Sequence, residues 1–230
     1  MGKIKIVTQI GSLPYDNVKD AVEYSLRHEI PFLPELPRMG EFMLDYIKKP
    51  GILACLDEFK KHDFQKVKIQ CVGPATLVKN GYDKDEAIEK TRSHISALIK
   101  GLNSKTIILF LDEPSCSADF YDKKLWEETF RGFNVVRGIH NCGEVGWNEM
   151  FDSDIEIISF DASRYKISGN RNGKKISWGI EKPKDATDFQ YGDLITLPCG
   201  MSPAKYGKAD CEKSLEMLLK TSKKLAYQLL

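Results

Sequence analysis

Short apolar runs that alternate with helix-like stretches constrain the fold of this chain more than any other feature. The runs are rich in β-branched and aromatic residues, and stretches with helical period lie between several of them, most clearly at 16–28, 83–102 and 211–230. Near-continuous apolar strands that alternate with helices indicate a parallel sheet covered on both faces. The eight runs occupy 4–10, 31–36, 66–72, 106–112, 134–139, 155–161, 175–180 and 193–198.

Eight such units predict an α/β fold, a compact (β/α)8 TIM barrel formed by residues 1–230 as a single domain. A length of 230 residues is near the lower end for that fold, so some connections must be short or non-helical. A doubly wound open sheet is the alternative. The turn-rich stretch SGNRNGKK (168–175) is predicted to be a surface loop before the seventh strand.

Composition narrows the classes of partner and the compartment. A formal net charge of +1, with basic and acidic residues mixed along the chain, predicts no nucleic-acid or membrane partner. No signal peptide and no membrane-length apolar segment is visible, so we expect a cytoplasmic protein. Thiols stay reduced there, and the six cysteines are interpreted as buried residues or metal ligands. Four of them are assigned structural roles: Cys55, Cys71, Cys116 and Cys211.

Polar side chains gather where the predicted strands end. In a (β/α)8 barrel the loops after the strands converge on one face, and the chemistry sits there. We therefore expect one rim rich in carboxylates and soft metal ligands. The residues at these positions are Gly11, Ser12, Glu35, Gly73, Pro74, Asp112, Glu113, His140, Cys142, Asp161, Glu181, Cys199 and Gly200.

Four of these residues form a candidate zinc site. His140 and Cys142 follow the fifth strand together, Asp161 ends the sixth strand, and Cys199 follows the eighth. Zinc prefers four ligands drawn from thiolate, imidazole and carboxylate, and a zinc site that carries out chemistry must free one position for substrate. Two thiolates and an imidazole would leave the metal electron-rich, so that a bound substrate thiolate stays nucleophilic. The alternatives are ordinary buried cysteines and a capping role for Asp161.

A string of short motifs then resembles a known family. In order along the chain, the motifs resemble segments of the catalytic barrel of cobalamin-independent methionine synthase, within the superfamily that includes uroporphyrinogen decarboxylase. The resemblance runs from about Thr8 to Met201. The motifs are TQIGSLPY, FLPELPRMGEFMLDY, CVGPATL, LFLDEPS, GIHNCGE, IISFDASR, WGIEKP and LPCGMSP.

The resemblance implies a zinc site and a pocket for an amino acid. It implies zinc at His140, Cys142 and Cys199, with Asp161 where the family usually has glutamate. It also implies that the substrate carboxylate meets backbone N–H and hydroxyl groups, and that two acids receive the substrate ammonium. The carboxylate would be bound by Gly11 and Ser12, and the ammonium by Glu35 and Asp112. The alternatives are a solvated loop acid at Glu35 and a turn acid at Asp112.

Departures from the family pattern bear on the methyl donor. The family carries an additional N-terminal barrel, which has no counterpart in this sequence, and a tryptophan for pterin stacking where this chain has Asn80. Glu181 stands where the family has a histidine that handles a proton near the donor, so Glu181 is the candidate catalytic residue. The donor is therefore expected to be a methyl-corrinoid protein or another non-folate compound.

These observations predict a Zn²⁺-dependent S-methyltransferase acting on homocysteine or a related small thiol. A uroporphyrinogen decarboxylase-like enzyme is one alternative, but it would need arginines to hold propionate groups, and the rim offers only Arg38, Arg137 and Arg164. The other alternative is a non-catalytic zinc-binding barrel.

Overall fold

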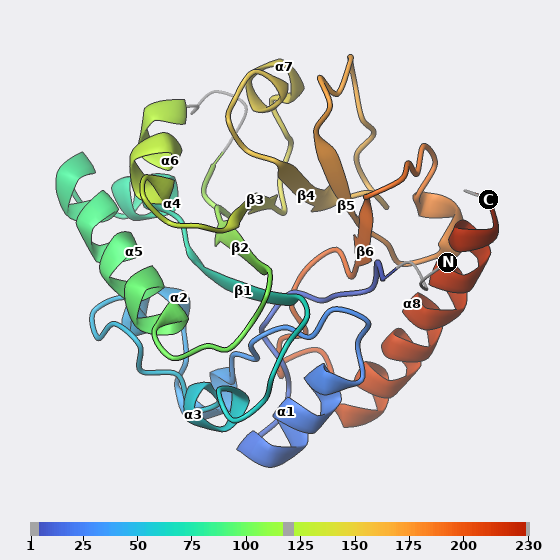
Figure 1. Ribbon diagram of the computed structural model, residues 1–230, viewed down its shortest axis with the longest axis horizontal. Coiled ribbons are helices and arrows are strands. Elements are labelled where there is room, and N and C mark those ends of the chain that lie inside the picture. Colours follow the sequence, from blue (N-terminus) through green and yellow to red (C-terminus); the bar gives the residue numbers. More distant parts are fainter. Residues whose placement is uncertain (1–4, 117–121, 229–230) are drawn as a thin grey trace.

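Strands and helices alternate along most of the chain (Figure 1). The computed structural model describes residues 5–116 and 122–228. The elements are α1 (Val18–Leu26), η1 (Pro37–Met39), α2 (Met43–Tyr46), α3 (Leu56–Phe59), β1 (Val67–Val72), α4 (Pro74–Lys79), α5 (Lys84–Ile99), β2 (Ile107–Asp112), α6 (Lys123–Phe130), β3 (Val136–Asn141), α7 (Trp147–Phe151), β4 (Ile157–Asp161), β5 (Lys175–Gly179), η2 (Pro183–Asp185), β6 (Leu194–Thr196) and α8 (Lys208–Gln228).

The strands of the described chain form one curled, six-stranded parallel sheet in the order β1-β2-β3-β4-β5-β6 (Figure 1). Each strand pairs with the next in sequence, as right-handed β-α-β connections favour. The register places Asp112 opposite His140 and His140 opposite Ser159. Because the strands are parallel, their carboxyl ends meet at one rim, where the sequence predicted the polar residues.

The first two predicted strands differ from expectation. Within the described chain, residues 6–12 and 32–35 carry isolated bridges instead of regular strands: Val7 bridges Ile195 of β6, and Phe32 bridges Lys68 of β1. Pro34 has no N–H to donate, which limits pairing of the second segment. The fold is therefore α/β with a curled six-stranded sheet, and the predicted eight regular strands are not all present.

The predicted helices are confirmed with small shifts at their ends. Asn17 caps α1 by accepting a hydrogen bond from the Asp20 N–H, and Asp83 caps α5 in the same way. The last helix, α8, begins at Lys208, three residues before its predicted start, and residues 229–230 of that prediction lie outside the described chain. No helix joins β4 to β5 in the described chain, so this connection is one of the non-helical ones that the chain length predicted.

The sheet separates two hydrophobic clusters. Most of the core lies between the sheet and the helices that surround it. A smaller buried cluster lies on the opposite face, which the sheet curls around. Successive residues of β2 belong to the two clusters in turn, because side chains along a strand point to alternate faces. The members of the smaller cluster are Ile30, Ile108, Phe110, Ile157 and Leu194.

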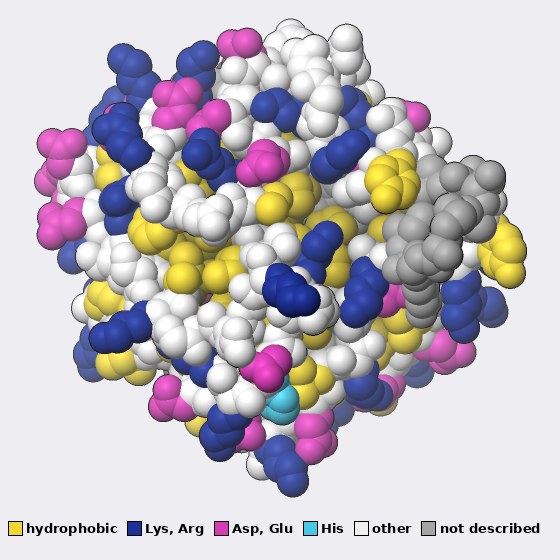
Figure 2. All heavy atoms as spheres, viewed as in Figure 1, with side chains coloured by type: hydrophobic (Ala, Val, Ile, Leu, Met, Phe, Trp, Pro, Cys, Tyr) yellow, Lys and Arg dark blue, Asp and Glu magenta, His cyan; other side chains and the backbone are white. Residues whose placement is uncertain are grey.

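The outer surface agrees with the composition. Figure 2 shows basic and acidic side chains interspersed over the face in view. Among the residues that the structure describes, no helix is both long enough and apolar enough to cross a membrane.

Candidate metal centre

His140, Cys142 and Cys199 come together as the sequence predicted. His140 lies near the end of β3, Cys142 follows that strand, and Cys199 follows β6. The Cys142 Sγ lies 2.9 Å from the His140 Nε2 and 3.5 Å from the Cys199 Sγ. One ligand atom from each residue lies within 4.8 Å of the others. A single ion placed among these atoms would contact all three.

The neighbouring strand orients the histidine. The Ser159 Oγ on β4 lies 3.0 Å from the His140 Nδ1, and the two residues are opposite each other in the sheet register. With Nδ1 engaged, Nε2 faces the two sulfur atoms. Partners of this kind fix the ring of a metal-binding histidine. Ser159 was not predicted from the sequence, although its position in an apolar strand next to the histidine strand was the available signal.

The two thiols have pKa values shifted in opposite directions. Hydrogen bonds from Cys142 and His140 to the Cys199 sulfur lower the pKa of Cys199 well below its ordinary value. The hydrogen bond to Cys199, together with burial, raises the pKa of Cys142 above its ordinary value. The lowered pKa favours the thiolate of Cys199, which is the form that binds a metal ion.

Asp161 lies at the same rim but holds a turn. It ends β4, and one carboxylate oxygen accepts hydrogen bonds from the Ser163 N–H (3.0 Å) and hydroxyl (2.6 Å). The other oxygen lies 3.4 Å from the Arg164 Nε. Asp161 is not part of the three-ligand cluster. No helix follows Asp161 in the described chain, so in this conformation Asp161 stabilises a turn, and ligation by Asp161 stays a prediction.

A pocket of about 470 Å³ opens beside the two thiols. Asp161 and Glu181 line it together with Cys142 and Cys199, and Met201 and Met217 add apolar surface. Glu181 is exposed, and its backbone N–H donates to Asp185, which fixes the start of the loop after β5. Thus the candidate catalytic acid shares a pocket with the thiols, and its role in proton transfer stays a prediction.

The two acids predicted to bind an ammonium group are buried at the same rim. Burial and the nearby Asp112 raise the pKa of Glu35 to about 8, and the Tyr46 hydroxyl lies 3.4 Å from the Glu35 Oε1. Burial also raises the pKa of Asp112. The Asp112 Oδ2 accepts a hydrogen bond of 2.7 Å from Gln70, whereas Oδ1 is buried with no hydrogen-bond partner among the described residues. Neither acid is a solvated loop residue.

Gly11 and Ser12 lie beside Glu35, and Ser12 also contacts the segment that follows Cys199. The Glu35 N–H donates to the Gly11 carbonyl (2.8 Å), and the Met201 N–H donates to the Ser12 carbonyl (2.7 Å). The Gly11 N–H itself donates to Gln70 at 2.8 Å. Its predicted contact with a substrate carboxylate stays a prediction, and it would require that hydrogen bond to break.

Two buried polar residues of β1 were not predicted. Lys68 and Gln70 are almost fully buried, and the Lys68 ammonium donates to the Gln70 side-chain oxygen at 2.5 Å. Burial lowers the pKa of Lys68 to about 8. The available signal was the alternation of polar residues in the run KVKIQCV, because residues two apart in a strand share a face.

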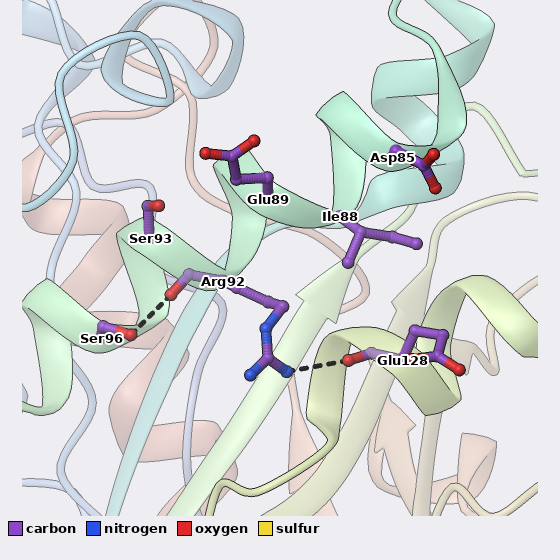
Figure 3. A pocket seen from close by; sticks show the side chains of 7 residues that line it. All are labelled: Asp85, Ile88, Glu89, Arg92, Ser93, Ser96 and Glu128. Carbon is purple, nitrogen blue, oxygen red and sulfur yellow. Dashed lines mark hydrogen bonds between the residues drawn. The ribbon is translucent and has the colours of Figure 1, made fainter.

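In the described chain, neither the depression on the helices nor the arginines form a cluster comparable to the candidate metal centre. The depression of about 500 Å³ in Figure 3 lies between α5 and α6, and Arg92 there donates to the Glu128 carbonyl, so it caps the end of α6. Of the arginines that a decarboxylase would need, Arg137 is paired with Asp154 near the start of β3, away from the end that bears His140.

Comparison with known proteins supports the fold. No family model and no curated protein matches the sequence. A solved structure that does match is a B12-independent methionine synthase from Shewanella sp. W3-18-1 in complex with selenomethionine. The two share 17% sequence identity over 80% of this chain and 67% of that chain, with a TM-score of 0.58. This chain therefore has a methionine synthase-like barrel fold, as its motifs predicted.

Proposed function

We propose that this chain is a zinc-dependent S-methyltransferase whose methyl acceptor is homocysteine or a related small thiol. The observation that carries the proposal is the position of the His140–Cys142–Cys199 cluster next to buried acids at one rim of the sheet. A metal centre would hold a thiol, and the acids would hold the ammonium group of the same molecule. The fold shared with a methionine synthase agrees with this assignment.

The donor atoms fit zinc. Two sulfurs and one imidazole nitrogen within 4.8 Å of one another are the soft ligands that a tetrahedral zinc site uses, with a position left for substrate. Bound zinc would lower the pKa of a substrate thiol and leave its sulfur nucleophilic. Asp161 is the nearest candidate for a fourth ligand, and it would have to leave Ser163 to reach the metal. Both cysteines must stay reduced, which agrees with the predicted cytoplasmic location.

The residues of this chain would bind and orient the acceptor. Ser159 keeps the His140 Nε2 directed at the thiols, and the acids Glu35 and Asp112 accept the ammonium group of the substrate. A buried ammonium needs polar acceptors, and the two acids buried at this rim would supply them. Ser12 would donate its hydroxyl to the substrate carboxylate. Fixing the acceptor in this way would contribute roughly 7 to 11 kcal/mol by proximity and orientation.

The same proposal extends to the donor side and to the barrel. Glu181 lines the pocket beside the thiols and would exchange a proton there as methyl transfer proceeds. The bridged segments 6–12 and 32–35 would complete an eight-membered ring between β6 and β1, and so bring Ser12 and Glu35 to the rim.

Metal content and turnover test the function together. We expect about one zinc per chain, lost in Cys142→Ser and Cys199→Ser because each removes a thiolate ligand. Elemental analysis of the purified proteins measures this, with Cys71→Ser, a buried cysteine of β1, as the matched control that keeps its zinc. The zinc form should produce methionine from homocysteine when methylcobalamin or methyltetrahydrofolate is supplied. Full zinc in both ligand variants would reject the site, and zinc without methyl transfer from any donor would favour a non-catalytic metal-binding barrel.

A further inference from the structure

Gln70 connects Asp112, which the proposed function assigns to the substrate ammonium, with Gly11 and Lys68. It is 2% exposed and lies on β1. Its Oε1 accepts hydrogen bonds from the Gly11 N–H (2.8 Å) and the Lys68 ammonium (2.5 Å), and its Nε2 donates to the Asp112 Oδ2 (2.7 Å). One side chain thus joins the first segment, β1 and β2 at the rim.

These contacts fix the direction of the Gln70 amide. Gly11 N–H and the Lys68 ammonium are both donors, whereas the Asp112 carboxylate is an acceptor. If the amide were rotated by half a turn, its NH₂ group would face two donors and its oxygen would face a carboxylate. All three hydrogen bonds would then be lost in a buried place, where each unsatisfied group costs roughly 1 to 3 kcal/mol.

The fixed amide also determines which Asp112 oxygen remains available. Gln70 occupies Oδ2, and Oδ1 is buried without a hydrogen-bond partner among the described residues. A buried carboxylate oxygen with no donor is unfavourable unless a ligand supplies one. Glu35 is the second acid near this position, and among the described residues its side chain has a long contact of 3.4 Å with the Tyr46 hydroxyl.

The local charges favour a cation as that ligand. Among the described residues, two acids, Glu35 and Asp112, share the buried space with one ammonium, that of Lys68. The Lys68 ammonium lies 4.9 Å from the centre of the Phe110 ring and is already bound to Gln70. An ammonium at Asp112 Oδ1 would supply the donor that this oxygen lacks, and it would also favour the ionised form of the neighbouring Glu35.

We infer that Gln70 is a positioning residue that holds Asp112 with Oδ1 free, so that the site selects thiols bearing an ammonium group over thiols that lack one. This inference rests on the proposed function. Gln70 itself need not touch the metal or the sulfur, because it acts through Asp112.

The test compares two thiols that differ only in the amino group. Calorimetric titration of the zinc-loaded full chain with homocysteine and with 4-mercaptobutanoate gives a ratio of affinities. We expect wild type to prefer homocysteine, and Gln70→Met to lower that ratio by about 10-fold or more, as the loss of a charge-assisted hydrogen bond would. Zinc content and 4-mercaptobutanoate affinity should stay near wild type. Gln65→Met, the same change at an exposed position before β1, is the control.

A second variant covers the case in which Gln70→Met does not fold. Gln70→Glu can keep the acceptor for Gly11 and Lys68, and it can donate to Asp112 only when protonated. The ratio of homocysteine affinity to 4-mercaptobutanoate affinity in this variant, relative to wild type at the same pH, should fall at pH 8, where the introduced carboxyl group would lose its proton. The ratio should recover at pH 6, where that carboxyl group would regain the proton. A ratio equal to wild type in both variants would overturn the role of Gln70 alone. If wild-type protein binds neither thiol, the proposed function fails and this inference fails with it.

Discussion

Two adjacent acids at the end of β2 show how position decides the role of a residue. The Asp112 side chain lies on the face that the sheet curls around and keeps one oxygen unpaired. Glu113, one residue on, accepts hydrogen bonds from the Ala75 and Thr76 N–H groups and from Trp126 Nε1. Glu113 therefore anchors the start of α4, and Asp112 is the acid with capacity to bind a ligand.

The titration of Glu35 gives a prediction at the residue scale. Its pKa is raised from 4.5 to about 8, so between these pH values the folded protein holds a proton that the unfolded chain has lost. The free energy of unfolding must then fall as pH rises through this range. Replacing Glu35 by Gln removes that loss, so the variant should be more stable than wild type at pH 8, by on the order of 2 kcal/mol. Urea unfolding of the metal-free proteins at pH 5 to 8 measures the difference.

Other titratable groups lie close to Glu35, and their own ionisation must be considered in this experiment. They are the acids Asp112 and Glu41, the Tyr46 hydroxyl and the Lys68 ammonium. The pKa of Lys68 is lowered to about 8, so its own contribution changes mainly above the range measured. The exposed substitution Glu23→Gln should leave the pH dependence as in wild type. Equal slopes for Glu35→Gln and wild type would mean that Glu35 ionises normally in the folded protein.

At the scale of elements, the connection between β4 and β5 has no helix in the described chain and is held by a buried ion pair. The loop predicted at 168–175 contains Arg171, which is 6% exposed and pairs with the fully buried Asp193 at 2.8 Å. Asp193 also accepts from the Trp178 indole and from the Ile176 N–H on β5. Arg171 thus anchors the loop to the sheet, which explains how a connection without a helix is held in place.

Removing that arginine should destabilise the protein strongly. Arg171→Leu leaves the buried Asp193 without its cation, and such losses cost about 3 kcal/mol or more. The matched control is Arg131→Leu, which breaks an exposed pair with Glu128 and should cost under about 1 kcal/mol. The free energy of unfolding in urea compares the two. A similar small cost for both variants would show that the hydrogen bonds to Trp178 and Ile176 suffice for Asp193.

At the scale of the whole molecule, the proposed function makes the rim around the candidate metal centre the place where a methyl donor would approach. Asn80 ends α4, the helix that follows β1, and its side chain is exposed and donates to the Thr76 carbonyl at 2.8 Å. No aromatic ring is present at Asn80 to stack on a pterin. The matched solved structure is described as B12-independent, so it lends no support to a corrinoid donor, and the donor prediction rests on Asn80.

We expect methylcobalamin to support faster methionine formation than methyltetrahydrofolate. Stacking on an aromatic ring contributes roughly 0.5 to 1.5 kcal/mol beyond buried area, so Asn80→Trp should improve use of the folate about 2- to 10-fold. Steady-state kinetics with each donor measures this, and Asn80→Leu separates apolar area from stacking. Turnover with the monoglutamyl folate that equals or exceeds turnover with methylcobalamin would show that position 80 does not govern donor choice.

The sequence alone was sufficient for the strands β1 to β6, the main helices and the three soft ligands. Apolar runs and helical periods are local properties, and a parallel sheet brings strand ends together whatever the details of packing. His140, Cys142 and Cys199 could therefore be grouped before any coordinates were known. The same rule placed Glu35 and Asp112 at one rim, where both are buried.

Only the tertiary structure decided how the polar groups pair. Gln70 joins Gly11 to Asp112, and the first two apolar runs form bridges instead of regular strands. Sequence period gives the face on which a side chain lies, but these hydrogen bonds depend on distances of about 3 Å between residues far apart in the chain. Those distances are set by the curvature and packing of the whole sheet.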